Sequence, residues 1–153
     1  MSSLIPNPVI AQIAILVNDI DKVSQAYANF FGVEKPPIKI TDTADKTQVE
    51  YQGKSTQARI KMAFFQMSNL QLELIEPDEH PSTWRDHLNK YGEGPHHIAF
   101  MVEGMKEKIS LFESNAFPLQ QKGEYTGGRY AYFNTMNELK VVIELLENDR
   151  NEA

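Results

Sequence analysis

The stretch "QIAILV" at residues 12–17 recurs as "HIAFMV" at residues 97–102, 85 positions later. Each copy places apolar residues after one polar residue, a pattern that is typical of a buried strand. Each copy also precedes an amphipathic helix pattern. The apolar positions of these two patterns are Ile20, Val23, Tyr27 and Phe30 in the first and Met105, Ile109, Phe112 and Ala116 in the second. A strand and a helix that occur twice indicate two modules of the same design.

A second similarity lies downstream of each helix. "LQLELIE" at residues 70–76 aligns with "VVIELLE" at residues 141–147, so that Glu73 falls on Glu144. This offset of 71 is 14 shorter than the first, which requires a shorter connection in the second module. The polar stretch from residue 41 to 56 is expected to be a long loop or a mobile segment. Further strands are predicted at residues 36–40, 58–67, 118–121 and 129–135.

These patterns predict an α+β fold made of two βαβββ modules in tandem. The first module covers residues 9–77 and the second covers residues 94–147. Residues 78–93 between them contain Trp84, Leu88 and Tyr91 at helical spacing, which predicts a linker helix. A chain of 153 residues suits a single domain, residues 1–153.

Composition narrows the range of partners. The formal net charge of −6 and the pI near 5.2 disfavour binding to nucleic acid or to an anionic membrane. The N-terminus has no basic region followed by a long apolar run, so we expect a cytoplasmic, soluble protein. There is no cysteine, so a metal ion would have to be bound by oxygen and imidazole ligands.

Four polar residues occupy equivalent positions in the two modules. Gln12 and His97 start the repeated strands, and Glu73 and Glu144 lie within the second pair of strands. Glu144 has apolar neighbours on both possible strand faces, and a bare buried carboxylate is costly. A lone glutamate on an antiparallel strand is more often solvated, but the repeat places all four residues in equivalent pairs. They form a ligand set suited to one divalent ion, Zn, Co, Ni or Mn.

Four segments carry a family resemblance. "IAQIAILVNDIDKVSQAYANFFG", "LQLELIEP", "GEGPHHIAFMVEGM" and "VVIELLE" resemble the vicinal oxygen chelate superfamily, also called the glyoxalase/bleomycin resistance/dioxygenase fold. The resemblance is greatest to its methylmalonyl-CoA epimerase branch. It implies a curled, barrel-like mixed sheet around a metal site with ligands Gln12, Glu73, His97 and Glu144, and a homodimer by analogy. The usual epimerase pattern has histidine in place of Gln12, whereas the set found here resembles the ligands of eukaryotic-type glyoxalase I.

The resemblance also implies a reaction. Both enzymes remove a proton next to a carbonyl, and the resemblance makes Glu144 the base, while Glu73 is the second catalytic candidate. The family's opposing glutamate is missing from the strand at residues 58–67, where Lys61, or otherwise Glu73 or Glu50, could replace it. We expect a metal-dependent epimerase acting on a small-molecule thioester. The alternatives are lactoylglutathione lyase and a metal-free small-molecule binding or resistance protein.

Candidate substrate-binding residues are basic or flank the Gly-rich turn. Lys61, Gly128 and Arg129 are proposed for this role. A coenzyme A carrier would need basic groups for its phosphates, and the candidates for that are Lys54, Arg59, Lys61, Lys122 and Arg129.

Overall fold

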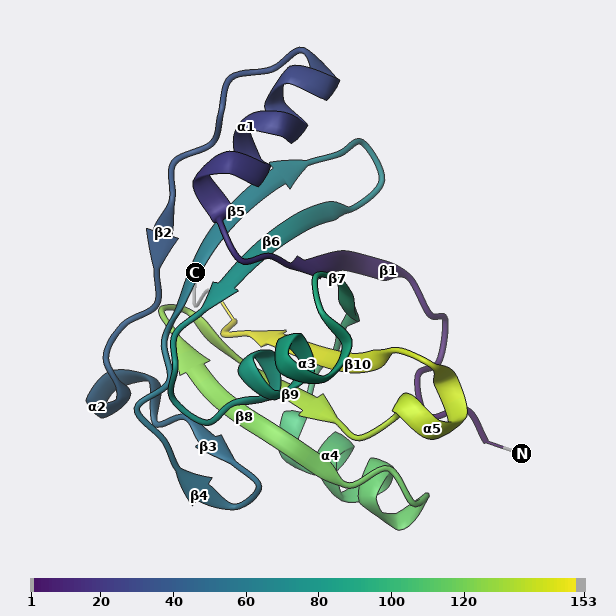
Figure 1. The fold of residues 1–153 in the computed structure, drawn as a ribbon. Helices are drawn as coiled ribbons and strands as arrows, with labels where there is room; N and C mark the ends of the chain where they lie inside the picture. The colour runs from purple at the N-terminus through teal and green to yellow at the C-terminus, as the bar shows by residue number, and fades with distance from the viewer. Residues whose placement is uncertain (1, 151–153) are drawn as a thin grey trace.

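The computed structural model describes residues 2–150 and places their ten strands in one mixed sheet that curls on itself (Figure 1). The order across the sheet is β2-β5-β6-β1-β7-β10-β9-β8-β3-β4. The first half of the chain contains β1 (Ile10–Leu16), α1 (Ile20–Phe31), β2 (Lys39–Ile40), α2 (Ala44–Thr47), β3 (Glu50–Tyr51), β4 (Lys54–Ser55), β5 (Ile60–Gln66) and β6 (Gln71–Pro77). The second half contains α3 (Thr83–Tyr91), β7 (Gly94–Met101), α4 (Met105–Ser114), β8 (Leu119–Tyr125), β9 (Gly128–Phe133), α5 (Met136–Leu139) and β10 (Val142–Asn148).

The predicted α+β class and the two βαβββ units are confirmed. Strands β1 and β7 pair antiparallel at the centre, β6 runs parallel to β1, and β10 runs parallel to β7. The units are completed by β5 and β2 on one side and by β9 and β8 on the other. Helix α3 forms where the linker helix was predicted and contacts β6 and β7.

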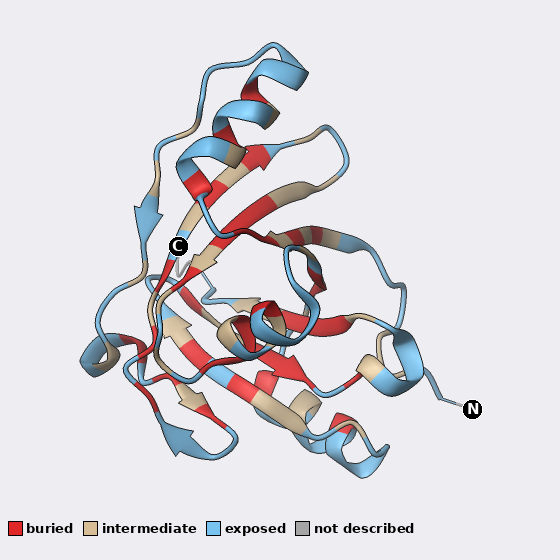
Figure 2. Ribbon diagram, viewed as in Figure 1, coloured by how far each residue is buried: buried red, intermediate tan, exposed pale blue. Residues whose placement is uncertain are grey.

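Three apolar clusters hold this arrangement together. One lies between α1 and the first unit, and a second lies between α4 and the second unit. The third joins the two units beneath α3 and includes Ala14, Leu16, Trp84, Tyr132 and Val142. Buried residues therefore concentrate on the central strands, whereas the outer faces of the helices are exposed (Figure 2).

Helix α1 is capped at both ends. The side chain of Asp19 accepts a hydrogen bond from the Lys22 amide, and Gly32 ends the helix in the left-handed conformation at φ +68°. The predicted apolar face was wrong at Phe30, which is 82% exposed. The buried face instead passes through Ser24 and Ala28, because the turn of the helix carries Phe30 away from the sheet.

The stretch predicted as a loop or mobile segment contains ordered structure. We call residues 41–58 the bridging segment, because it connects β2 to β5 of the first unit while its strand β3 pairs with β8 of the second. Val49 and Tyr51 are buried, and the Tyr51 hydroxyl donates to Asp86 of α3 over 2.6 Å. Two strand predictions also had wrong bounds: β2 covers only Lys39–Ile40, and β8 extends to Tyr125. Among residues 2–150, no helix is both long and apolar enough to cross a membrane.

Candidate metal centre

The strand register brings the four predicted ligand residues together. Across the central pair, Ala14 lies opposite His97 and Gln12 lies opposite Ala99. The parallel partners carry Glu73 opposite Ala14 and Glu144 opposite Ala99. Four adjacent strands therefore present these side chains at one level of the sheet, and all four side chains are buried.

The ligand atoms converge on the imidazole of His97. Its Nε2 lies 2.8 Å from Gln12 Oε1, 3.2 Å from Glu144 Oε1 and 3.7 Å from Glu73 Oε1. Ligand atoms that share one ion at about 2.1 Å lie about 3 Å apart when their bonds are at right angles. The spacings of Gln12 and Glu144 from His97 Nε2 match this value, whereas Glu73 lies farther out, and His97, Glu73 and Glu144 do not bring three ligand atoms within 4.8 Å of one another. A bound ion would have to draw the two carboxylates closer together.

Hydrogen bonding also agrees with a metal ion. The amide nitrogen of Gln12 donates to Gln71 Oε1 over 2.8 Å, which turns Gln12 Oε1 toward His97. Glu144 Oε1 is buried and has no hydrogen-bond partner. A buried oxygen without a partner costs about 1–3 kcal/mol unless another group satisfies it. One imidazole nitrogen, one amide oxygen and two carboxylates fit Zn, Co, Ni or Mn.

A buried chain of polar groups orients His97 from behind. His97 Nδ1 lies 2.9 Å from His96 Nδ1, and His96 Nε2 lies 3.1 Å from the Thr83 hydroxyl. That hydroxyl donates to Gln120 Oε1 over 3.0 Å. With Thr83 donating to Gln120, His96 Nε2 can donate to Thr83 and His96 Nδ1 can accept the proton of His97 Nδ1. A bound ion would then take the lone pair of His97 Nε2, whereas without an ion this nitrogen can donate to Gln12 Oε1 instead.

Burial and mutual repulsion shape the charges at this site. Burial, and then the negative charge of Glu144, raise the pKa of the Glu73 carboxyl well above its ordinary value. Burial, and then the neighbouring imidazoles of His97 and His87, hold the pKa of His96 well below its ordinary value. Burial and the two carboxylates raise the pKa of the Tyr132 hydroxyl. Two buried acidic side chains beside the same imidazole favour a bound cation or a protonated carboxyl group.

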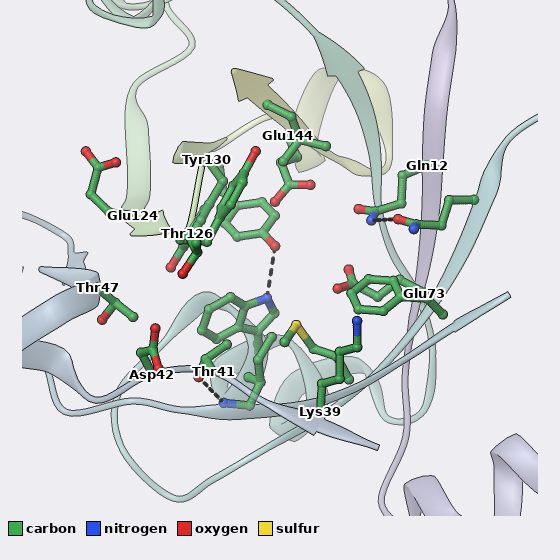
Figure 3. A pocket seen from close by; sticks show the side chains of 18 of the residues that line it. Gln12, Lys39, Thr41, Asp42, Thr47, Glu73, Glu124, Thr126, Tyr130 and Glu144 are labelled. Carbon is green, nitrogen blue, oxygen red and sulfur yellow. Dashed lines mark hydrogen bonds between the residues drawn. The ribbon is translucent and has the colours of Figure 1, made fainter. Parts of the chain in front are cut away.

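The site opens into a cavity of about 770 Å³, a volume that suits a small molecule. Figure 3 shows Gln12, Glu73 and Glu144 at one side of it. The walls are mostly apolar or aromatic, and the bridging segment lines the side away from these three residues. The indole nitrogen of Trp84 donates to the Tyr132 hydroxyl over 3.1 Å within the wall. Other wall residues are Ile60, Met62, Phe64, Val49, Tyr130 and Leu146.

A comparison with known families identifies the superfamily of the chain. The model of the Glyoxalase/Bleomycin resistance protein/Dioxygenase superfamily matches residues 11–133, most of the chain. The chain belongs to this superfamily. The predicted resemblance is thereby confirmed at the level of the superfamily.

Several relatives show how this superfamily fold recurs. A solved hypothetical protein from Bacillus halodurans C-125, BH1468, has a TM-score of 0.64 at 21% identity over 96% of this chain and 99% of its own. Methylmalonyl-CoA epimerase from Mycobacterium tuberculosis has a TM-score of 0.64 at 20% identity, covering 98% of this chain and 93% of its own. These likenesses show the shared fold.

A curated relative is similar over a shorter stretch. Uncharacterized protein YqjC from Bacillus subtilis (strain 168) is 32% identical over 95 residues, which is 58% of this chain. The match covers 66% of YqjC, so the chain spans just under two thirds of the length of this relative.

The three predicted substrate-binding residues do not line the cavity. Lys61 is on the opposite face of β5, where it pairs with Glu76 at 3.2 Å. Arg129 pairs with Glu147 at 2.9 Å. A side chain at Gly128 would collide with the backbone carbonyl of Glu147, so this glycine serves close packing of β9 against β10. None of the three lines the cavity.

The other basic candidates for coenzyme A are mostly engaged elsewhere. Lys122 pairs with Glu50 at 3.4 Å. Glu50, which the sequence offered as a replacement for the opposing glutamate, is therefore also engaged in an ion pair. Arg59 donates twice to the Thr41 carbonyl, at 3.0 and 2.7 Å. Lys54 is exposed on β4. The basic residue that does line the cavity is Lys39, which the sequence patterns did not single out.

A second group of possible ligands lies outside the cavity. Asp78, Glu79 and His80 bring three ligand atoms within 4.8 Å of one another in the turn after β6. The Asp78 carboxylate already accepts hydrogen bonds from the Arg59 and His80 amides, so it serves the turn. Of the supporting residues, His96 is next to the candidate ligand His97 in the sequence, whereas Gln71 and Thr83 carry no local sequence signal.

Proposed function

We propose that this protein is a metal-dependent isomerase or lyase that removes a proton from the carbon next to a thioester or ketone carbonyl. The observation that carries this proposal is the buried, unpartnered Glu144 Oε1, 3.2 Å from His97 Nε2 and at the wall of a small-molecule cavity. The donor set of Gln12, Glu73, His97 and Glu144 would hold the ion. A bound divalent ion would polarise the carbonyl and stabilise the negative charge that develops on its oxygen.

In this proposal Glu144 acts as the general base. Its carboxylate lines the cavity, so a substrate carbon can reach it. Glu73 has a raised pKa beside Glu144 and can hold a proton there. The aromatic wall around Trp84 and Tyr132 excludes water from the developing charge.

The identity of a second acid separates two versions of the reaction. An epimerase of the methylmalonyl-CoA type needs a proton donor on the face opposite the base, and the solved relatives of that name support this version. On β5, however, Met62 faces the cavity and Lys61 faces away. This observation favours a glyoxalase-type transfer, in which one carboxylate both removes and returns the proton.

Metal content tests the site first. We would measure bound Zn, Co, Ni and Mn by elemental mass spectrometry after chelation and reloading. Wild-type protein should bind about one ion per chain, and His97→Ala should lose it. His80→Ala is the matched control, because this histidine lies in the turn outside the cavity. Equal loading of His97→Ala and wild type would overturn the site, and no loading of either would favour the metal-free binding protein.

Activity with the loaded protein then tests the reaction. Methylmalonyl-CoA epimerisation and lactoylglutathione formation would be followed in deuterated water. Uptake of solvent deuterium at the carbon next to the carbonyl would support proton abstraction. Glu144→Gln should abolish this uptake while the protein stays folded, and an unchanged rate would remove Glu144 from the mechanism.

A further inference from the structure

Two tyrosines of β9, Tyr130 and Tyr132, form a matched pair on the wall of the cavity. Side chains alternate along a strand, so both point toward the cavity, whereas Ala131 and Phe133 belong to the apolar cluster under α4. Figure 3 shows Tyr130 on the same side of the cavity as Glu144. The two hydroxyls can therefore be compared as neighbours on one face of one strand.

Each of these hydroxyls accepts a hydrogen bond from a side-chain nitrogen. Trp84 Nε1 donates to Tyr132 over 3.1 Å, and Gln121 Nε2 donates to Tyr130 over 3.1 Å. An indole nitrogen is a donor only, so Tyr132 is the acceptor of its bond with Trp84. A phenol carries one proton, and the proton of Tyr132 is therefore left for a different acceptor.

The two tyrosines differ in their neighbours on β10. Tyr132 lies directly opposite Glu144, whereas Tyr130 lies opposite Leu146. Side chains that are directly opposite in an antiparallel pair have Cβ atoms about 4.5–5.5 Å apart. On the other flank of Glu144, the partner on β7 is Ala99, which has no polar side chain. Tyr132 is therefore the polar neighbour that the adjacent strands place beside Glu144.

The Tyr132 hydroxyl has the properties of a donor to this carboxylate. Burial, and then the charges of Glu144 and Glu73, raise the pKa of Tyr132 well above its ordinary value, and a side-chain hydrogen bond with Glu144 adds to the shift. The hydroxyl therefore keeps its proton. Glu144 Oε1 has no partner and lies 3.2 Å from His97 Nε2, so the other carboxylate oxygen is the one available to Tyr132.

Tyr132 is itself held in place by its surroundings. The residue is 2% exposed, and its ring packs edge-on against Trp84 with ring centres 5.8 Å apart. The imidazole of His97 lies against the same ring, with centres 5.0 Å apart. A ring fixed in this way leaves its hydroxyl few alternative positions, so a hydrogen bond from it would set the direction of the Glu144 carboxylate.

We propose that Tyr132 is a positioning residue for the base: its hydroxyl donates to Glu144 and directs the carboxylate toward the carbon that loses the proton. The inference rests on the proposed function, in which Glu144 is that base. Trp84 supports this bond by donating to the same hydroxyl, because hydrogen bonds in a row strengthen one another. Tyr130 has no such role, since the side chain of Leu146 opposite it accepts no hydrogen bond.

A double-mutant cycle on the metal-free protein tests the contact without an assay of activity. We would compare the urea midpoints of wild type, Tyr132→Phe, Glu144→Ala and the double variant. Tyr132→Phe keeps the ring and removes only the hydroxyl, so it should lower the midpoint more in wild type than in Glu144→Ala. The same cycle with Tyr130→Phe should give equal shifts in both backgrounds. Equal shifts for Tyr132→Phe would overturn the contact.

Kinetics of the metal-loaded protein test the positioning role. Tyr132→Phe should lower kcat about tenfold and leave KM and metal content unchanged, because the hydroxyl acts on the base and not on the ion or the substrate. Any effect of Tyr130→Phe should fall on KM. Trp84→Phe removes the indole N–H and should lower kcat about threefold, with no further loss when it is combined with Tyr132→Phe.

The outcomes separate this inference from the proposed function. Suppose that Glu144→Gln abolishes deuterium uptake, but Tyr132→Phe lowers kcat no more than Tyr130→Phe does or acts on KM instead. The positioning role would then fall and the proposed function would stand. If Glu144→Gln keeps full uptake, the assignment of the base falls, and the positioning role of Tyr132 falls with it.

Discussion

The two βαβββ units are alike at the candidate metal centre and differ in what covers it. Strands β1 and β7 carry Gln12 and His97, and strands β6 and β10 carry Glu73 and Glu144, at equivalent positions. The second unit returns directly from β8 to β9 through a short turn. The first unit inserts the bridging segment between β2 and β5, and this segment extends the sheet of the other unit. The repeat thus supplies the candidate ligands, and the departure from it supplies one wall of the cavity.

Equivalent residues in the two units also have different surroundings. Glu144 carries the unpartnered oxygen, whereas burial and the charge of Glu144 raise the pKa of Glu73. His97 is supported from behind by the hydrogen-bonded residues His96 and Thr83, whereas the residue behind Gln12 is Gln71. Residues at equivalent positions in the two units can therefore have different roles, and three predictions test this.

The largest effect should separate the two glutamates. Glu144→Gln should lower turnover about 10²–10⁴-fold, because it removes the general base. Glu73→Gln should lower turnover at least tenfold less, because its amide oxygen can still bind the ion. Turnover and metal content would be measured on the same samples. Equal losses of turnover would mean that both glutamates transfer protons, as a two-base epimerase requires.

A smaller effect should appear behind His97. Thr83→Val keeps the shape of the side chain but removes the hydroxyl that contacts His96, so metal affinity should fall about 10–100-fold. Affinity would be measured by competition with a chelator. Thr83→Ser should restore it, and Thr56→Val is the control because its buried hydroxyl donates to the Pro81 carbonyl instead. Equal losses of metal affinity in Thr83→Val and Thr56→Val would mean that the hydrogen bonds from Thr83 through His96 to His97 have no specific effect on the ion.

The smallest effect should be on the pH dependence of stability without metal. The pKa of Glu73 is raised in the folded state, so the unfolded state releases this proton first as pH rises above about 4. The folded state therefore loses stability between that pH and the raised folded pKa. Glu73→Gln should be increasingly more stable than wild type from about pH 4 to pH 7, as followed by urea unfolding. A difference that does not change with pH would contradict the raised pKa.

The repeat made much of the fold and the candidate centre predictable. Two strand starts and two strand middles were enough to select Gln12, Glu73, His97 and Glu144, because equivalent positions in paired units lie close together. Lys61 was predicted to bind substrate but does not line the cavity, because side chains alternate between the two faces of β5. Met62 and Phe64 face the cavity, so Lys61 faces outward.

Other features depend on contacts that a local pattern does not contain. Val49 and Tyr51 are isolated in a polar stretch, and their burial follows from pairing with β8, a strand about 70 residues away in sequence. Gln71 and Thr83 support the centre through hydrogen bonds between distant segments, and neither residue type is unusual at its position.

The antiparallel pairing of β1 with β7 has a consequence for how the chain folds. Each unit contains two of the four candidate ligand residues, and Gln12 and Glu144 are 132 positions apart. The centre is therefore complete only after the two units have docked along this seam, a contact of long sequence separation that forms slowly. An ion bound there would act as a staple across the seam, slowing its opening and making thermal stability depend on ion concentration.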